Sequence, residues 1–119
     1  CRLFLDKLLP EEVEKVLYLD GDVLNTGSLK ELWSLDMGES SAAAVIDCLG
    51  EKYYELLGLG KNARYCNSGV ILFDLDKWRK DSMGDMITMD MFFLWSRLCL
   101  MQLCKVRLKF FILNITHIR

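Results

Sequence analysis

The chain has 119 residues, of which 52% are hydrophobic and only one is proline, and its formal net charge is −2. This composition excludes a disordered chain and is sufficient for one domain with a buried core. The small net charge provides no basic surface for nucleic acid, and no apolar run is long enough for a membrane helix. We therefore expect one domain over residues 1–119, no nucleic-acid partner and no transmembrane segment.

The first elements lead directly to a pair of carboxylates. The stretch from Leu3 to Leu9 predicts a helix that ends at Pro10, and the apolar run from Val16 to Leu19 predicts a buried strand. That strand runs straight into Asp20 and Asp22, which are separated by one glycine. Open α/β folds bind ligands at the carboxyl ends of their strands, so this pair is expected at a ligand-binding edge.

The chemistry of the pair favours a divalent cation. Carboxylate oxygens are hard ligands for Mg²⁺ or Mn²⁺, and these ions keep open positions for water or for phosphate oxygens of a substrate. The alternative is an ordinary tight turn, which is the commoner explanation for an isolated Asp-x-Asp. The position of Asp20 and Asp22 immediately after a strand favours a site.

A short helix is expected next. Ser28 and Glu31 have the spacing of a capping box, which predicts a helix from Leu29 to Leu35. Trp33 lies within it and is expected to pack in the core.

Two further apolar runs predict strands, from Ala42 to Ile46 and from Val70 to Phe73. A short amphipathic helix is expected between them, from Tyr53 to Leu59, and another helix around Trp78. Strands that alternate with helices indicate an α/β fold.

The cysteines indicate a reducing compartment. There are five, at positions 1, 48, 66, 99 and 104, and they form neither a short metal-binding pair nor an even disulfide framework. Reduced thiols in a cytoplasmic protein are the expected state.

Several blocks of the sequence, taken together, closely resemble glycosyltransferase family 8, which includes bacterial lipopolysaccharide galactosyl- and glucosyltransferases and glycogenin. The order and spacing of the blocks match from about position 2 to about position 80. The resemblance implies a partial GT-A fold with a mixed, mostly parallel sheet flanked by helices. The matching blocks are Lys15–Val23, Ser28–Trp33, Ala44–Asp47 and Tyr65–Val70.

The resemblance implies retaining transfer of a hexose, galactose or glucose, from a UDP-sugar to a glycan or lipopolysaccharide-type acceptor. Asp20 and Asp22 match the family's metal-binding aspartates, with Mn²⁺ or Mg²⁺ as the metal. A bound cation neutralises the charge that develops on the departing UDP. The protein is expected in the cytoplasm, where it could also associate peripherally with the inner face of the membrane.

The resemblance also implies donor-sugar contacts. Asp47 matches a family aspartate that binds sugar hydroxyls, and Asn67, Ser68 and Gly69 match the block that lines the sugar pocket. Without the resemblance, Asp47 would be interpreted as a helix cap, and the block from Asn67 to Gly69 as a turn. Arg2 matches a family arginine that lies near the donor, with a one-residue difference in register. The alternative is that Arg2 is a solvated surface residue. No catalytic residue is assigned.

The chain also departs from the family. The family's first strand, which builds much of the uridine pocket, would precede Cys1, and its Gln-Asp and His-Gly-Lys blocks are not recognised. His117 is interpreted as a tail residue, and 82–119 as a divergent C-terminal segment in which Cys104–Phe110 resembles a family strand. We attribute the altered stretch 82–103 to a frameshift, which the nucleotide sequence read in all frames would test.

Two other functions remain open. A non-catalytic α/β remnant would bind a partner or a nucleotide weakly and would lack metal-dependent UDP binding. Phosphoryl transfer or hydrolysis would require a nucleophile and a positioned acid, and no motif around Asp20 supplies either.

Overall fold

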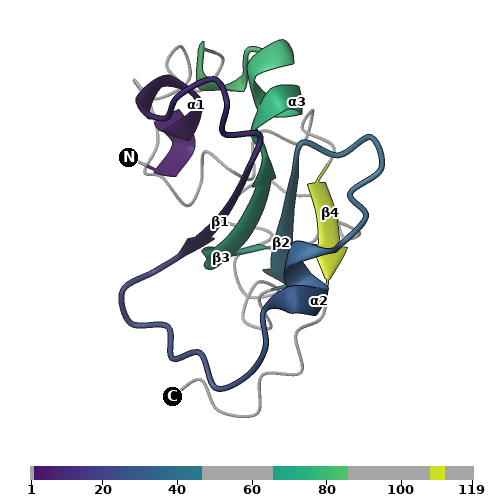
Figure 1. The fold of residues 1–119 in the computed structure, drawn as a ribbon. Coiled ribbons are helices and arrows are strands. Elements are labelled where there is room, and N and C mark those ends of the chain that lie inside the picture. The colour runs from purple at the N-terminus through teal and green to yellow at the C-terminus, as the bar shows by residue number, and fades with distance from the viewer. Residues whose placement is uncertain (1, 47–65, 86–107, 112–119) are drawn as a thin grey trace, which may run out of the picture.

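The computed structural model describes residues 2–46, 66–85 and 108–111 (Figure 1). Short helices and four strands make up this part of the chain. In chain order they are η1 (Arg2–Phe4), α1 (Leu5–Leu8), β1 (Lys15–Leu19), α2 (Lys30–Trp33), β2 (Ala42–Ile46), β3 (Cys66–Asp74), α3 (Leu75–Lys80) and β4 (Leu108–Phe111).

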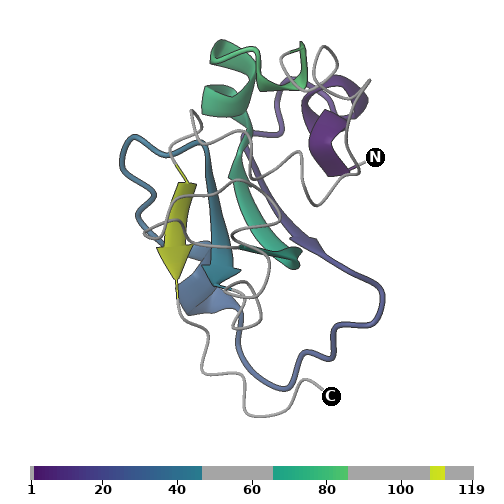
Figure 2. The same ribbon diagram turned by 180° about the vertical axis from the view of Figure 1, so that it is seen from behind.

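The strands form one sheet in the order β1-β3-β2-β4 (Figures 1 and 2). β3 is antiparallel to both β1 and β2, whereas β4 is parallel to β2. The sheet is therefore mixed, as expected, but the expectation of a mostly parallel sheet is wrong for the described strands, because two of their three pairings are antiparallel. A continuous apolar run reads the same in either direction, so the sequence pattern did not show that β3 is reversed.

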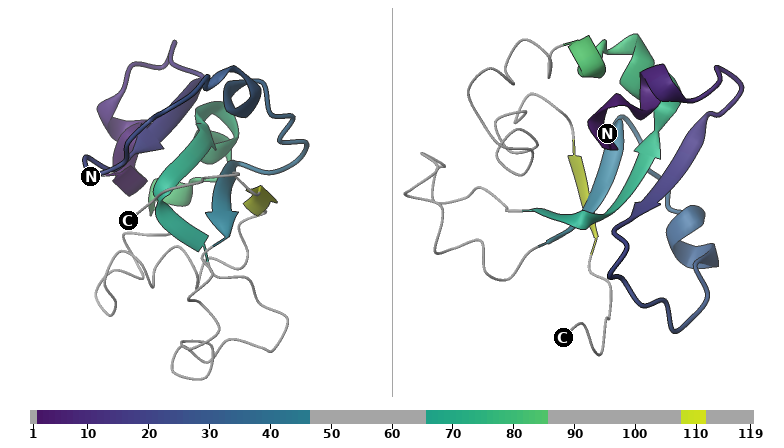
Figure 3. Two further views of the ribbon diagram at one scale, coloured as in Figure 1. Left: turned by 90° about the horizontal axis from the view of Figure 1, so that it is seen from below. Right: turned by 90° about the vertical axis from the view of Figure 1, so that its left-hand side faces the viewer.

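The core lies around β3 and the helix that follows it. Ile71, Leu72 and Phe73 are at most 1% exposed. The indole of Trp78 in α3 packs edge-on against the Phe73 ring, with the ring centroids 5.0 Å apart. Figure 3 shows α3 and α1 together at one end of the sheet, and Leu3 from η1 belongs to the same buried cluster.

The strand predictions are confirmed in position. β2 has the predicted bounds, and the predicted strand from Val70 to Phe73 lies inside the longer β3. β4 overlaps the strand-like segment Cys104–Phe110. The predicted N-terminal helix is present only as η1 and α1, because Leu9 is already extended.

Two predictions around α2 are wrong. The helix begins after Leu29 and has no side-chain cap; the hydroxyl of Ser28 accepts a 3.3 Å bond from the Lys30 amide instead. Trp33 is 48% exposed rather than buried in the core. The helix has only four residues and buries Leu32, so the Trp33 indole lies on the outside. The amine of Lys15 lies 5.6 Å from the centroid of the Trp33 ring.

Some predictions lie outside the described residues, namely Asp47, the helix from Tyr53 to Leu59, His117 and four of the five cysteines. Cys66 is buried and its sulfur is reduced, as predicted. Among the described helices, none has the length and apolar character needed to cross a membrane.

Candidate functional site

The aspartate turn begins where β1 ends. Tyr18 and Asp20 lie on the same face of the extended chain because side chains alternate along a strand. The Tyr18 hydroxyl donates a 2.7 Å hydrogen bond to Oδ1 of Asp20. The Asp20 amide donates to the carbonyl of Gly69 at 2.8 Å, and the Val23 amide returns to the Asp20 carbonyl at 3.1 Å. The turn is thereby fixed to β3, while Asp22 is exposed.

A bulge in β3 faces this turn. Ala44 pairs with Ile71 and Val45 pairs with Asn67, so three residues of β3, positions 68–70, have no counterpart on β2. Bulges redirect side chains and are frequent beside active sites. Here the bulge brings the predicted Asn67-Ser68-Gly69 block against Asp20.

Arg2 joins the same cluster from the N-terminal segment. Its guanidinium donates to the carbonyl of Ser68 at 2.6 Å and lies 3.2 Å from Oδ1 of Asp20. It also lies over the Tyr18 ring, 4.9 Å from the centroid. The alternative of a solvated surface arginine is therefore wrong. An ion pair, a hydrogen bond and a cation–π contact hold the side chain in place.

Ser68 presents a polar atom without a partner. The residue is 6% exposed, and its Oγ forms no hydrogen bond within the described part of the chain. Buried hydroxyls are almost always paired, so an unpaired one at a bulge calls for an explanation. A polar ligand group is one that fits the position.

Gly69 allows the close approach of the turn and the bulge. A Cβ at this position would lie 3.0 Å from Oδ1 of Asn67 and 3.1 Å from Oδ2 of Asp20. The Gly69 amide also donates a 2.8 Å bond to Oδ1 of Asn67. A larger residue would have to push either the carboxylate or the amide aside.

We expect Gly69→Ala to weaken Mn²⁺ binding by about tenfold, because the added methyl group displaces the Asp20 carboxylate. The matched control is Gly27→Ala, where a Cβ meets no atom within 4 Å. Electron paramagnetic resonance of free Mn²⁺ measures both affinities. Equal affinities for the two variants would contradict this prediction.

The residues present fit a divalent cation by the nature of their donors. The ion pair with Arg2 and the hydrogen bond from Tyr18 both engage Oδ1 of Asp20, and neither engages its Oδ2. Asp22 offers a second carboxylate on the same turn. No cluster of three or more metal-ligating side chains occurs in the described ranges, but Mg²⁺ and Mn²⁺ commonly use one or two carboxylates together with water and substrate phosphates.

The Tyr18 hydroxyl is tied electrostatically to this carboxylate. The hydrogen bond to Asp20 and then burial raise the pKa of Tyr18 above its ordinary value of 10.0, and the nearby charge of Arg2 opposes the shift. A raised pKa in the folded state means that the stabilisation is complete below pH 10 and is lost as the pH rises through the folded-state pKa.

We expect Tyr18→Phe to lower the free energy of unfolding by about 1 kcal/mol at neutral pH, the usual contribution of one hydrogen bond. The difference between the parent and the variant should shrink as the pH rises above about 10, because the Tyr18 hydroxyl then ionises first in the unfolded chain. Urea unfolding across this pH range measures it. A difference that is independent of pH would show that the bond to Asp20 contributes nothing.

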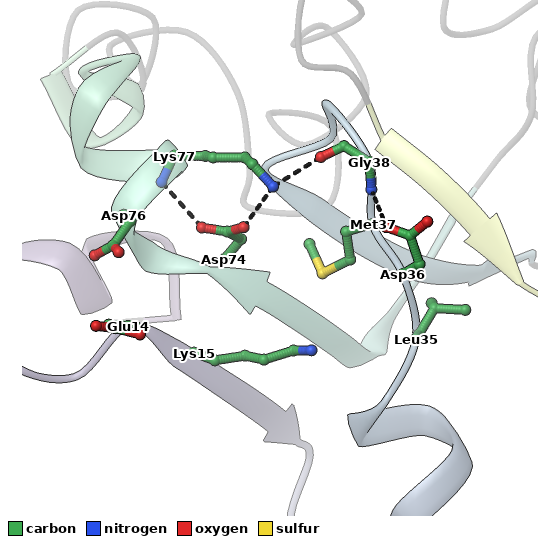
Figure 4. A pocket seen from close by; sticks show the side chains of 9 residues that line it. All are labelled: Glu14, Lys15, Leu35, Asp36, Met37, Gly38, Asp74, Asp76 and Lys77. Carbon is green, nitrogen blue, oxygen red and sulfur yellow. Dashed lines mark hydrogen bonds and ion pairs between the residues drawn. The ribbon is translucent and has the colours of Figure 1, made fainter.

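A hollow of about 310 Å³ lies at the ends of β1 and β3 that are farther from the aspartate turn (Figure 4). Its lining is mostly charged: Glu14, Lys15, Leu35, Asp36, Met37, Gly38, Asp74, Asp76 and Lys77. Asp74 caps α3 by accepting from the Lys77 amide at 3.0 Å, and the Lys77 amine bonds to Asp74 and to the carbonyl of Gly38. These bonds explain why charged residues line the hollow: they cap α3 and anchor the loop at Gly38. The sequence did not predict this hollow.

Comparison with known proteins decides the family. Residues 1–90 match Glycosyl transferase family 8. The chain belongs to this family. It is 38% identical over 82 residues to glycosyltransferase GlyE of Streptococcus pneumoniae, and the aligned region covers 69% of this chain and 17% of GlyE. It is 39% identical over 85 residues to the lipopolysaccharide 1,2-glucosyltransferase of Escherichia coli, and that aligned region covers 65% of this chain and 24% of the relative.

Solved structures of the family confirm the fold. The galactosyltransferase LgtC, in complex with donor and acceptor sugar analogs, superposes with a TM-score of 0.78 at 31% identity over 92% of this chain and 42% of LgtC. GlyE of Streptococcus pneumoniae superposes with a TM-score of 0.68 at 28% identity over 92% of this chain and 26% of GlyE. The family 8 chain described here is thus part of a GT-A fold and spans less than half of either enzyme.

Proposed function

We propose that the chain is part of a metal-dependent hexosyltransferase whose donor, a UDP-sugar, binds at the cluster of Arg2, Asp20 and Ser68. One observation carries the proposal. Three separate segments bring together a guanidinium, a carboxylate and a buried hydroxyl that has no hydrogen-bond partner in the described part of the chain. A convergence of polar groups that leaves the Ser68 hydroxyl without a partner among the described residues is typical of a site for a polar ligand.

Asp20 and Asp22 would hold the metal, Mn²⁺ or Mg²⁺, as hard oxygen ligands. When bound, the cation supplies charge neutralisation for the diphosphate that leaves with UDP. Arg2 keeps Oδ1 of Asp20 in place from one side, which leaves Oδ2 on the side of the bulge. The turn thus presents preorganised oxygens rather than flexible ones.

The donor sugar would lie along the bulge. The Ser68 hydroxyl can donate and accept. The Gly69 amide engages the side-chain oxygen of Asn67, and the NH₂ group of Asn67 remains as a donor. Asp47 is proposed as a further acceptor for sugar hydroxyls. We propose galactose or glucose as the hexose and a glycan or lipopolysaccharide-type acceptor, in keeping with the names of the similar proteins. We also propose retention of configuration, which rests on the family resemblance.

Calorimetric titration of UDP into the chain, with Mn²⁺ or with EDTA present, tests the proposal. Affinity should fall at least about tenfold in EDTA, and equally in the double variant Asp20→Asn, Asp22→Asn, because the diphosphate loses its counter-charge. The control is Asp81→Asn, an exposed aspartate beyond α3. Binding that is unchanged by EDTA or by the double variant would overturn the metal-dependent site and favour a non-catalytic module.

A further inference from the structure

One arginine outside the candidate site anchors the N-terminal segment. Arg79 lies near the end of α3, where its side chain is 21% exposed. Among the described residues, its guanidinium donates to backbone carbonyls of residues 6–13, and a 3.7 Å ion pair joins it to Asp76 in its own helix. The acceptors are the carbonyls of Asp6 at 3.5 Å, Leu9 at 3.4 Å, Pro10 at 2.9 Å, Glu11 at 3.2 Å and Val13 at 3.0 Å.

The N-terminal segment needs an external anchor. α1 has four residues, and helices this short are not stable without tertiary contacts. The carbonyls at the end of a helix have no partners within it, and the chain from Leu9 to Glu14 belongs to no helix or strand. One planar guanidinium with five N–H groups can satisfy several such carbonyls together.

The anchored segment carries Arg2. η1 runs directly into α1 with no loop between them, and the side chain of Leu3 is buried in the same cluster as Trp78. At its other end the segment is fixed where the Leu75 amide donates to the carbonyl of Glu14 at 2.7 Å. Figures 1 and 3 show α1 against α3. The way residues 2–13 dock on α3 therefore determines where the guanidinium of Arg2 lies.

We propose that Arg79 is a positioning residue that sets the contact of Arg2 with Asp20 and Ser68. The proposal deepens the proposed function, on which it rests for its effect on ligand binding. The placement of Arg2 itself can be measured without a ligand. None of the hydrogen bonds and ion pairs of Arg79 with described residues involves Arg2, Asp20 or Ser68, so Arg79 would act through the backbone of the segment before β1.

The chemistry requires arginine rather than any cation. Lysine would place three donors on a single nitrogen and cannot span carbonyls spread over residues 6–13. Arg79→Lys should therefore behave much like Arg79→Met, although it keeps the charge. Lys80→Met is the matched control, because this exposed residue on the same helix makes no hydrogen bond or ion pair with described residues.

The first experiment uses the ligand-free chain and amide NMR. Arg79→Met should speed hydrogen exchange at Leu9 and Val13 by about tenfold or more, because both amides are bonded inside the anchored segment. It should also shift the amide signals of Asp20 and Ser68, while exchange along the β1–β3 ladder stays as in the parent. Unchanged signals at Asp20 and Ser68 would overturn the proposal.

The second experiment measures whether the effects of Arg79 and Arg2 on ligand binding are coupled. UDP-glucose is titrated, with Mn²⁺ present, into the parent, Arg79→Met, Arg2→Ala and the double variant. Arg79→Met should weaken binding by about tenfold in the parent and by less than about twofold when Arg2 is already alanine. Equal losses in both backgrounds would mean a merely structural role and overturn the proposal. If the parent binds no UDP-glucose, the proposed function fails, and the exchange experiment still decides the positioning role.

Discussion

Trp78→Ala should lower the free energy of unfolding by about 3–5 kcal/mol, the usual loss when a large buried aromatic is truncated. Trp78 is 1% exposed and packs edge-on against Phe73, in the cluster that also holds Leu3 and Leu75. Its loss opens a cavity between the sheet and both N-terminal helices. Urea unfolding followed by circular dichroism measures the change.

Trp33→Ala is the matched control, since it removes the same side chain from a half-exposed position. Its expected loss is about 1 kcal/mol or less, because the indole is 48% exposed and therefore buries much less surface than that of Trp78. Equal losses for the two tryptophans would contradict the arrangement of the core around β3 and α3.

Asp20→Asn should lower the affinity for Mn²⁺ by about 100-fold or more, because losing a ligand charge costs at least as much as losing an outer-shell partner. The substitution also removes the ion-pair partner of Arg2. Electron paramagnetic resonance of free Mn²⁺ measures the affinity. Asp22→Asn should weaken binding as well, without disturbing Arg2.

The control for these variants is Asp81→Asn, which removes the same charge from an exposed position beyond α3. It should bind Mn²⁺ as the parent does. If Asp20→Asn and Asp81→Asn bind equally well, the aspartate turn is not a metal site.

Local patterns located β1 and β2 well because each is a short apolar run with clear ends, whereas β3 extends beyond its predicted run at both ends. Ala42–Ile46 is both the predicted and the observed strand. The direction of β3 depends on its neighbours rather than on its own residues, so the antiparallel pairing could not be inferred from the run itself. Trp33 was misplaced because helical spacing does not show which side of a four-residue helix faces the core.

The candidate site was found mainly through the family resemblance and the two aspartates after a strand. What the sequence could not show is how the separate segments meet. The approach of Gly69 to Asp20, the unpaired hydroxyl of Ser68 and the bonds from Arg79 all depend on tertiary structure. Arg2 is the clearest case, since its role changes from a surface charge to a partner of Asp20 once the N-terminal segment is docked.

The most direct test of a metal site at the aspartate turn is amide NMR of the chain with traces of Mn²⁺, which broadens signals close to the ion. The signals of Asp20, Asp22 and Gly69 should broaden first. Broadening that instead centres on Asp36 and Asp74, in the charged hollow at the other end of the sheet, would contradict the assignment, as would uniform broadening across the chain.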